Sequence, residues 1–264
     1  MSKTLDLDVL LSTCLQASWA AGAELERRFH QEREIHHKGV IDLVTDADRA
    51  AETIAITTIR NAFPDHAILA EESGAVGPKS NVRWILDPLD GTTNYAHKVP
   101  HFAVSIGCEV DGERRVGVVY NPMHRETFVA TKGRGATLNG ARISCTEVDK
   151  PTHALMATGF PYYLHERPKE VIDLFAKFAT RVQGIRRFGS AALDLCYVAA
   201  GRFDGFFENG LRAWDMAAGT LIVEEAGGIT SRLDGSPLDM EKADVLAAGK
   251  TLHPLLVSIN NGTA

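Results

Sequence analysis

Three absences limit what this chain can be. Its four cysteines make no C-x-x-C pair, no apolar run approaches the ~18 residues of a membrane-spanning helix, and basic residues do not outnumber acidic ones. Scattered cysteines are typical of reduced core thiols rather than of disulfides or zinc sites. Because nucleic acids and anionic lipids bind clustered Lys and Arg, a formal net charge of −6 argues against both partners. We therefore expect a cytoplasmic protein with no membrane partner and no direct nucleic-acid partner.

What the sequence does contain is ordinary for a folded protein. Its 264 residues are 45% hydrophobic and 23% charged, which allows one large domain or two small ones. Apolar residues at helical spacing predict a helix over residues 7–25, followed by a polar loop over residues 31–38. A second helix is expected after the acidic stretch 42–48, and Pro64 ends it.

Strand patterns dominate the middle of the chain. Short apolar runs at residues 66–70 and 82–86, each followed by acidic residues, predict two buried strands. Residues 102–143 alternate apolar and polar side chains, with turn signals at Asp111-Gly112 and Asn139-Gly140. This pattern predicts a meander of antiparallel strands.

The second half of the chain alternates between strand and helix patterns. Strands and helices are expected in turn at residues 155–158, 171–182, 185–188, 191–200, 203–207 and 214–226. Such alternation favours an α/β layer. The fold class is therefore α+β, with an N-terminal α+β subdomain (1–148) and a C-terminal α/β subdomain (149–264) packed around one site.

The segment from Trp84 to Asn94 carries the clearest chemistry. A buried strand delivers Asp87 and Asp90, and the following Gly91-Thr92-Thr93 has the composition of a helix start, whose N–H groups bind anions. The carboxylates would repel such an anion unless a cation lies between them. Oxygen-only ligands select hard divalent ions such as Mg²⁺. Two acids at this spacing also fit a solvated turn or a helix cap, but the whole segment predicts a metal-dependent phosphate site.

This segment and three others resemble the signature of the inositol monophosphatase family. The four motifs occur in order along most of the chain: Asp42-x-Val44-Thr45-x-x-Asp48, Ala70-Glu71-Glu72-Ser73, Trp84 to Asn94, and Ala213-Trp214-Asp215-Met216-Ala217-Ala218-Gly219 with Glu225-Ala226-Gly227-Gly228. The resemblance implies a layered αβαβα sandwich of the type shared with fructose-1,6-bisphosphatases. It also implies Mg²⁺ dependence, inhibition by Li⁺, a homodimer and a small phosphorylated polyol as substrate.

The resemblance further implies a role for each matching residue. Two to three Mg²⁺ ions would be held by four acids and one backbone carbonyl: Glu71, Asp87, Leu89, Asp90 and Asp215. Asp48 and Thr92 would take a proton from the attacking water, and Glu71 belongs with them to the catalytic set. The N–H groups of Gly91, Thr92 and Thr93 would hold the phosphate. The alcohol half of the substrate would contact Asp90, Gly189, Ser190, Ala191, Glu208 and Arg212.

Several of these residues have a simpler alternative interpretation. Asp48 and Asp215 each fit the capping position of a following helix, and Asp46 fits a helix start. Asp42 fits a turn position, and Glu72 is expected to face solvent or to contact a metal ligand rather than to bind the metal itself. Arg212 stands where animal members of the family have histidine, and Lys38 lies one residue closer to the first motif than in those members.

The leading functional hypothesis is hydrolysis of inositol-1-phosphate to inositol and phosphate, by in-line attack of water without a phosphoenzyme. Thr92-Thr93-Asn94-Tyr95 favours the inositol monophosphatase branch. The alternatives are a broader sugar or nucleotide phosphatase, acting for example on fructose-1,6-bisphosphate or histidinol phosphate, and a phosphatase with an added transcription-regulatory binding role. The last rests on residues 184–210, which resemble a bacterial branch that assists transcription antitermination through protein partners.

Overall fold

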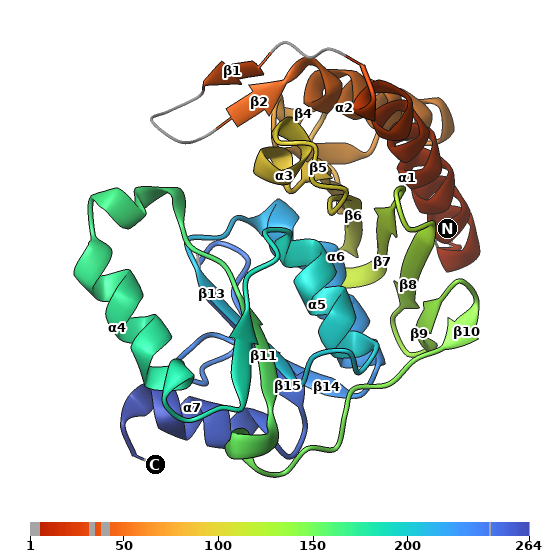
Figure 1. Ribbon diagram of the computed structural model, residues 1–264. Coiled ribbons are helices and arrows are strands. Elements are labelled where there is room, and N and C mark those ends of the chain that lie inside the picture. Colours follow the sequence, from red (N-terminus) through yellow and green to blue (C-terminus); the bar gives the residue numbers. More distant parts are fainter. Residues whose placement is uncertain (1–5, 32–34, 38–42, 243, 264) are drawn as a thin grey trace.

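A computed structural model describes residues 6–31, 35–37, 43–242 and 244–263, arranged in five layers (Figure 1). The first layer holds α1 (Leu7–Phe29) and α2 (Asp46–Ala62), and the last holds α4 (Pro168–Ala179) and α7 (His253–Asn261). Between them lie two sheets separated by α5 (Ala191–Ala199) and α6 (Ala213–Glu225). The expected αβαβα sandwich is confirmed.

The larger sheet has eight strands in the order β10-β9-β8-β7-β6-β5-β3-β4. Their bounds are β3 Ala67–Ala70, β4 Gly74–Val76, β5 Val82–Asp90, β6 Ala103–Val110, β7 Glu113–Asn121, β8 Glu126–Thr131, β9 Gly135–Leu138 and β10 Ala141–Arg142. Within this sheet β3 and β5 pair in parallel, and the other neighbouring strands pair antiparallel. The meander is confirmed, and both turn pairs have positive φ: Asp111 54° and Gly112 79°, Asn139 49° and Gly140 82°.

The smaller sheet has five strands in the order β12-β11-β13-β15-β14. Their bounds are β11 Leu155–Thr158, β12 Gly184–Arg186, β13 Gly205–Asn209, β14 Gly228–Ser231 and β15 Asp244–Gly249. The predicted strands and helices of this half are present, with ends shifted by a few residues. The division at residues 148/149 stays a prediction.

Helix α6 packs directly on the larger sheet because two glycines leave room for it. A Cβ at Gly107 would lie 2.9 Å from the Cβ of Ala217, and a Cβ at Gly117 would lie 2.9 Å from the carbonyl oxygen of Ala218. Any larger residue at either position would push the helix off the sheet. This close approach brings the first turn of α6 beside the end of β5.

Two local predictions were wrong. The loop expected over residues 31–38 contains strand β1 (Ile35–His37), which pairs antiparallel with β2 (Leu43–Thr45). Its hydrogen bonds come from the partner strand, which the local composition does not reveal. The strand expected over residues 82–86 continues to Asp90 through a register shift against β6. Lys38 and Asp42 lie outside the described residues.

Two expectations from composition can be compared with the structure. All four cysteines are free thiols, and burial raises the pKa of Cys14, Cys108, Cys145 and Cys196. Among the described residues, no helix combines the length and the apolar character that crossing a membrane requires.

Candidate active site

Asp87 and Asp90 lie at the irregular end of β5. The pairing with β6 shifts register between them, so Asp87 stands opposite Ser105 and Asp90 opposite Ala103. The Leu89 N–H donates to Asp87 Oδ1 at 2.9 Å. Both carboxyl groups are buried. The acids expected in a turn after the strand therefore lie on a distorted strand end, which a β-bulge can use to redirect side chains.

Asp90 joins the two halves of the chain. Its Oδ2 accepts hydrogen bonds from the Ser190 hydroxyl at 2.6 Å and the Ala192 N–H at 2.7 Å, and its Oδ1 accepts one from the Ala191 N–H at 3.2 Å. Burial raises the pKa of Asp90 to about 6, although these hydrogen bonds act to lower it. A carboxylate at the N-terminus of α5 also interacts favourably with the helix dipole. Ser190 and Ala191 thus contact Asp90 directly.

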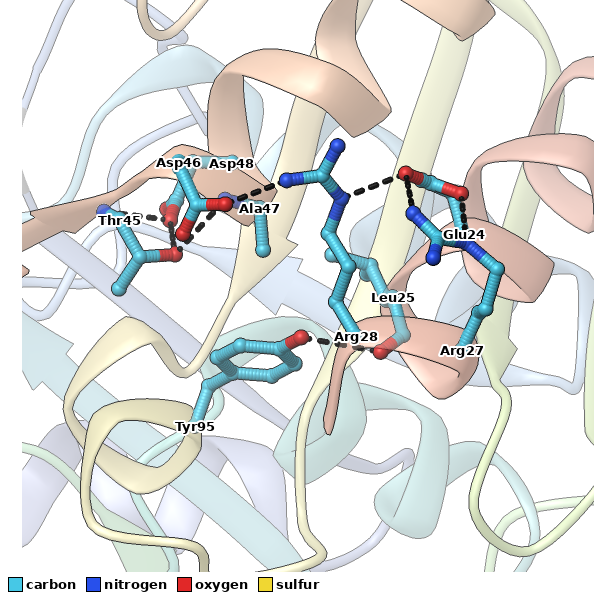
Figure 2. Close-up of polar contacts among 9 residues, drawn as sticks. All are labelled: Glu24, Leu25, Arg27, Arg28, Thr45, Asp46, Ala47, Asp48 and Tyr95. Atoms are coloured by element: carbon cyan, nitrogen blue, oxygen red, sulfur yellow. Dashed lines mark hydrogen bonds and ion pairs between the residues drawn. The ribbon is translucent and has the colours of Figure 1, made fainter. Parts of the chain in front are cut away.

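Asp48 occupies the first turn of α2, where it caps the helix and meets Thr92 (Figure 2 shows the capping contacts). Its Oδ2 accepts from the Thr45 N–H at 2.8 Å and the Thr45 hydroxyl at 2.6 Å. The Thr92 hydroxyl lies 3.1 Å from Asp48 Oδ1 and 3.0 Å from the Leu89 carbonyl oxygen. Burial raises the pKa of Asp48 to about 6. The capping alternative is confirmed, and it leaves Oδ1 directed at Thr92.

Gly91 makes the turn from β5 into the short helix α3 (Thr92–Ala96). Its φ of 99° is left-handed, and a Cβ there would lie 3.1 Å from the His101 carbonyl oxygen and 3.3 Å from that of Gly189. Only glycine fits both conditions. Thr92 is buried and Thr93 is exposed. The turn therefore starts α3 directly after Asp90.

Asp215 and Glu71 bring two more acids to this region. Asp215 lies in the first turn of α6, where its Oδ2 accepts from the Arg212 N–H at 2.6 Å. Glu71 directly follows β3, and its N–H donates to the Leu86 carbonyl at 3.1 Å. Burial, then the charges of Glu71, Asp90 and Asp215, raise the pKa of Asp87 well above its usual range. Burial and the charge of Asp90 act in the same way on Asp215.

The charges of Glu71 and Asp90 disfavour the ionised forms of Asp87 and Asp215, and such a group of acids fits a hard divalent cation such as Mg²⁺. The described part of the chain nonetheless holds no group of three or more His, Cys, Asp or Glu side chains already converged as ligands. The hydrogen bonds of Asp90 explain part of this lack of convergence, since they direct both of its carboxylate oxygens at the start of α5. The assignment of each acid to an ion therefore stays a prediction.

Glu208 extends from β13 toward the same region. Burial raises its pKa to about 8, the charge of Asp215 adds to this effect, and the charge of Arg187 opposes it. A Cβ on Gly159, just after β11, would lie 2.2 Å from either carboxylate oxygen of Glu208. The carboxylate therefore occupies the space that a side chain at residue 159 would fill. Arg212, at the N-cap of α6, is exposed.

Comparison with known proteins identifies the family. The model of the inositol monophosphatase family matches residues 6–261. The chain belongs to this family. It is 46% identical over 253 residues to the inositol-1-monophosphatase of Synechocystis sp., covering 94% of this chain and 87% of the relative. It is 44% identical over 241 residues to Nus factor SuhB of Escherichia coli (strain K12), covering 90% of each chain. The inositol monophosphatase structure from Anabaena (Nostoc) sp. PCC 7120 superposes with a TM-score of 0.90 at 39% identity, covering 98% of both chains.

Two residues of this inositol monophosphatase family member, Asp194 and Gly159, escaped the sequence analysis. Asp194 on α5 is 1% exposed, its Oδ1 has no hydrogen-bond partner among the described residues, and burial with the charge of Glu208 raises its pKa. The charge of Arg187 acts on both Asp194 and Glu208. Gly159 makes room for Glu208. The sequence carries no signal for Asp194 beyond a charged residue within an apolar helix pattern.

Proposed function

We propose that this chain is a Mg²⁺-dependent phosphomonoesterase that hydrolyses inositol-1-phosphate to inositol and phosphate. One observation carries the proposal: Asp87 and Asp90 are buried at the end of β5 directly before Gly91 and Thr92, the charges of Glu71 and Asp215 act on Asp87, and Asp48 is hydrogen-bonded to Thr92. Family membership supports a phosphatase of this class. The choice of inositol as the alcohol rests on the similarity to relatives named for it.

The chain's own residues divide the work between binding and proton transfer. Glu71, Asp87, Asp90, Asp215 and the Leu89 carbonyl would hold two to three Mg²⁺ ions, which when bound supply positive charge to activate water and stabilise the phosphoryl transition state. The N–H groups of Gly91, Thr92 and Thr93 orient the phosphate oxygens. Buried acids on rigid elements suit this task because their orientation changes little during the reaction.

Proton transfer runs through Thr92 and Asp48. The Thr92 hydroxyl takes the proton of the attacking water as it gives its own to Asp48 Oδ1, 3.1 Å away. The water oxygen forms a bond to phosphorus as the bond to the inositol oxygen breaks. That oxygen leaves with the bonding electron pair and takes a proton from solvent.

Recognition of the alcohol involves residues of the second half. Glu208 accepts hydrogen bonds from adjacent hydroxyl groups of the substrate, as suits a polyol. Arg212, at the exposed start of α6, contacts the solvent-facing side of the substrate. Gly189, Ser190 and Ala191 line the opposite side, where Ser190 and Ala191 are bonded to Asp90. These contacts would select among sugar and polyol phosphates, while the acids of the first half perform the reaction.

Phosphate release from a panel of substrates tests this function. The panel contains inositol-1-phosphate, fructose-1,6-bisphosphate, histidinol phosphate and adenosine 2′-monophosphate, each with Mg²⁺, with EDTA and with Li⁺. We expect the largest kcat/KM for inositol-1-phosphate, loss of activity in EDTA, and inhibition by Li⁺. Similar rates across the panel would favour the broader phosphatase, and no Mg²⁺-dependent release would refute the activity.

A second candidate function is a regulatory binding role added to catalysis. It is supported by the 44% identity to Nus factor SuhB. The expected result is that the tagged chain retains purified bacterial transcription-antitermination proteins, and that the inactive Asp90→Asn variant retains them equally. Failure to retain them, beside normal turnover of inositol-1-phosphate, would remove this candidate.

We also propose that the protein acts as a cytoplasmic homodimer. The exposed ring of Phe188, 41% accessible, supports a contact surface beside Arg186 and Arg187. It packs on the imidazole of His101 with 5.2 Å between ring centroids. An exposed aromatic ring flanked by arginines is typical of interface centres.

A further inference from the structure

The last turn of α1 reaches two elements of the candidate active site. Arg28 lies between two acids: its Nε donates to Glu24 Oε1 at 2.5 Å, and its Nη1 donates to Asp46 Oδ2 (Figure 2). Asp46 is the first residue of α2, directly after Thr45 and two residues before Asp48. A planar guanidinium can hold two carboxylates in a fixed geometry, which an ammonium group cannot. Arg28 therefore ties the end of α1 to the start of α2.

A second contact ties the same turn of α1 to α3. The Tyr95 hydroxyl donates to the Leu25 carbonyl oxygen at 2.9 Å (Figure 2). Tyr95 is fully buried in α3, three residues after Thr92, and its ring packs edge-on against Phe102 with 4.9 Å between centroids. The packing of the Tyr95 ring and its hydrogen bond to Leu25 thus help to hold α3 against α1.

These two contacts converge on the pair that transfers the proton. Asp48 belongs to α2 and Thr92 to α3, and the two side chains meet at 3.1 Å. If the proposed function holds, this distance must be kept while substrate binds and leaves. We propose that Arg28 is a positioning residue: through Asp46 it holds the first turn of α2 against α1, so that Asp48 stays in register with Thr92.

Because Arg28 is partly exposed, we expect it to affect the position of Asp48 more than the overall stability of the protein. Its side chain is 28% accessible and that of Asp46 is 40% accessible. Ion pairs this exposed contribute little to the free energy of unfolding. A small displacement of a catalytic group, in contrast, lowers the rate strongly. The rate should therefore respond to Arg28 more than the stability does.

Arg27 provides a matched control. It donates to the same acid, with Nε 2.8 Å from Glu24 Oε2 and Nη2 2.7 Å from Glu24 Oε1, and it is 54% accessible. The hydrogen bonds described for Arg27 join it to Glu24, within α1, Tyr95 contributes a further electrostatic interaction, and no contact with Asp46 is described. Removing either arginine deletes one positive charge from the same helix turn, but only Arg28 bridges to α2.

The test compares kcat and KM for inositol-1-phosphate at saturating Mg²⁺. For Arg28→Ala we expect kcat to fall about tenfold with KM within about twofold of the original value. Arg28→Lys should recover part of the loss, and Arg27→Ala should keep the original kcat. Asp46→Ala removes the acceptor at the other end of the bridge, so it should match Arg28→Ala, and the double variant should be no slower.

Hydrogen exchange provides a readout that needs no substrate. The Thr45 and Ala47 amides donate to Asp48 Oδ2 and Thr45 Oγ1, so they report on the first turn of α2. In Arg28→Ala these amides should exchange about fivefold faster than in the original protein, and in Arg27→Ala their exchange rates should not change. Unchanged exchange in Arg28→Ala would overturn the proposal, as would equal kcat in both alanine variants. If the original protein releases no phosphate, the proposed function fails, while the exchange result still decides the role of Arg28.

Discussion

Replacing Asp90 with asparagine is expected to lower kcat for inositol-1-phosphate by more than about a hundredfold at saturating Mg²⁺. The substitution removes a negative charge from a buried group of acids and one of two acceptor oxygens that face α5. Neither loss can be compensated by solvent, because Asp90 is 8% exposed. Steady-state phosphate release measures the effect.

The matched control for this variant is Glu113→Gln, which removes one negative charge from a side chain that is 68% accessible. It should keep the original kcat and stability. Circular dichroism should show that Asp90→Asn remains folded, since one amide oxygen can still accept from Ser190 or Ala192. Near-normal kcat for a folded Asp90→Asn variant would contradict the metal assignment.

Removing Mg²⁺ is expected to destabilise the protein at alkaline pH and to have no effect at acidic pH. At pH 8, saturating Mg²⁺ should raise Tm by about 5–10 °C over EDTA, since an ion at a hundred times its Kd contributes about 2.7 kcal/mol. Near pH 4 the difference should vanish, because protonated carboxyls do not bind the ion. Thermal unfolding at several pH values, with and without Mg²⁺, measures this.

The pH dependence of this Mg²⁺ effect follows from the raised pKa values of the buried acids. Asp90 is raised from 3.8 to about 6 and Glu208 from 4.5 to about 8, both first by burial. In the metal-free protein the stability that these groups contribute is fully present below pH 3.8 and is lost as pH rises through 6 and then 8. A bound cation offsets the charge that develops over this range.

A monovalent salt at matched ionic strength serves as the control for general screening, and it should not reproduce the effect. The Asp87→Asn variant should show a smaller difference between Mg²⁺ and EDTA at pH 8. A Mg²⁺ effect that is equal at pH 4 and pH 8 would show that the buried acids do not form the binding site.

Much of the fold could be predicted because periodicity and turn chemistry act locally. Asp111-Gly112 and Asn139-Gly140 adopt the positive φ angles that their composition favours, and the strands on either side follow from them. Strand β1 could not be predicted, since its three residues acquire strand geometry only by pairing with β2. The continuation of β5 to Asp90 depends likewise on its pairing with β6.

The candidate site was predictable where a motif is contiguous and unpredictable where it depends on tertiary contact. Residues 84–94 locate Asp87, Asp90 and the Gly91 turn from a single segment. The bond from Ser190 to Asp90 and the space that Gly159 leaves for Glu208 depend on how the two sheets face each other. The burial of Asp194 is set by that packing too.

The bond between Ser190 and Asp90 also has a consequence for how the chain folds. It joins residues 100 positions apart, so it contributes nothing until the long intervening segment has closed. The meander of the larger sheet consists of neighbouring hairpins and can form early, whereas this contact must wait for α5 to dock. A refolding chain will therefore regain most of its secondary structure before it regains a complete reaction centre, and the return of turnover will mark the final step of folding.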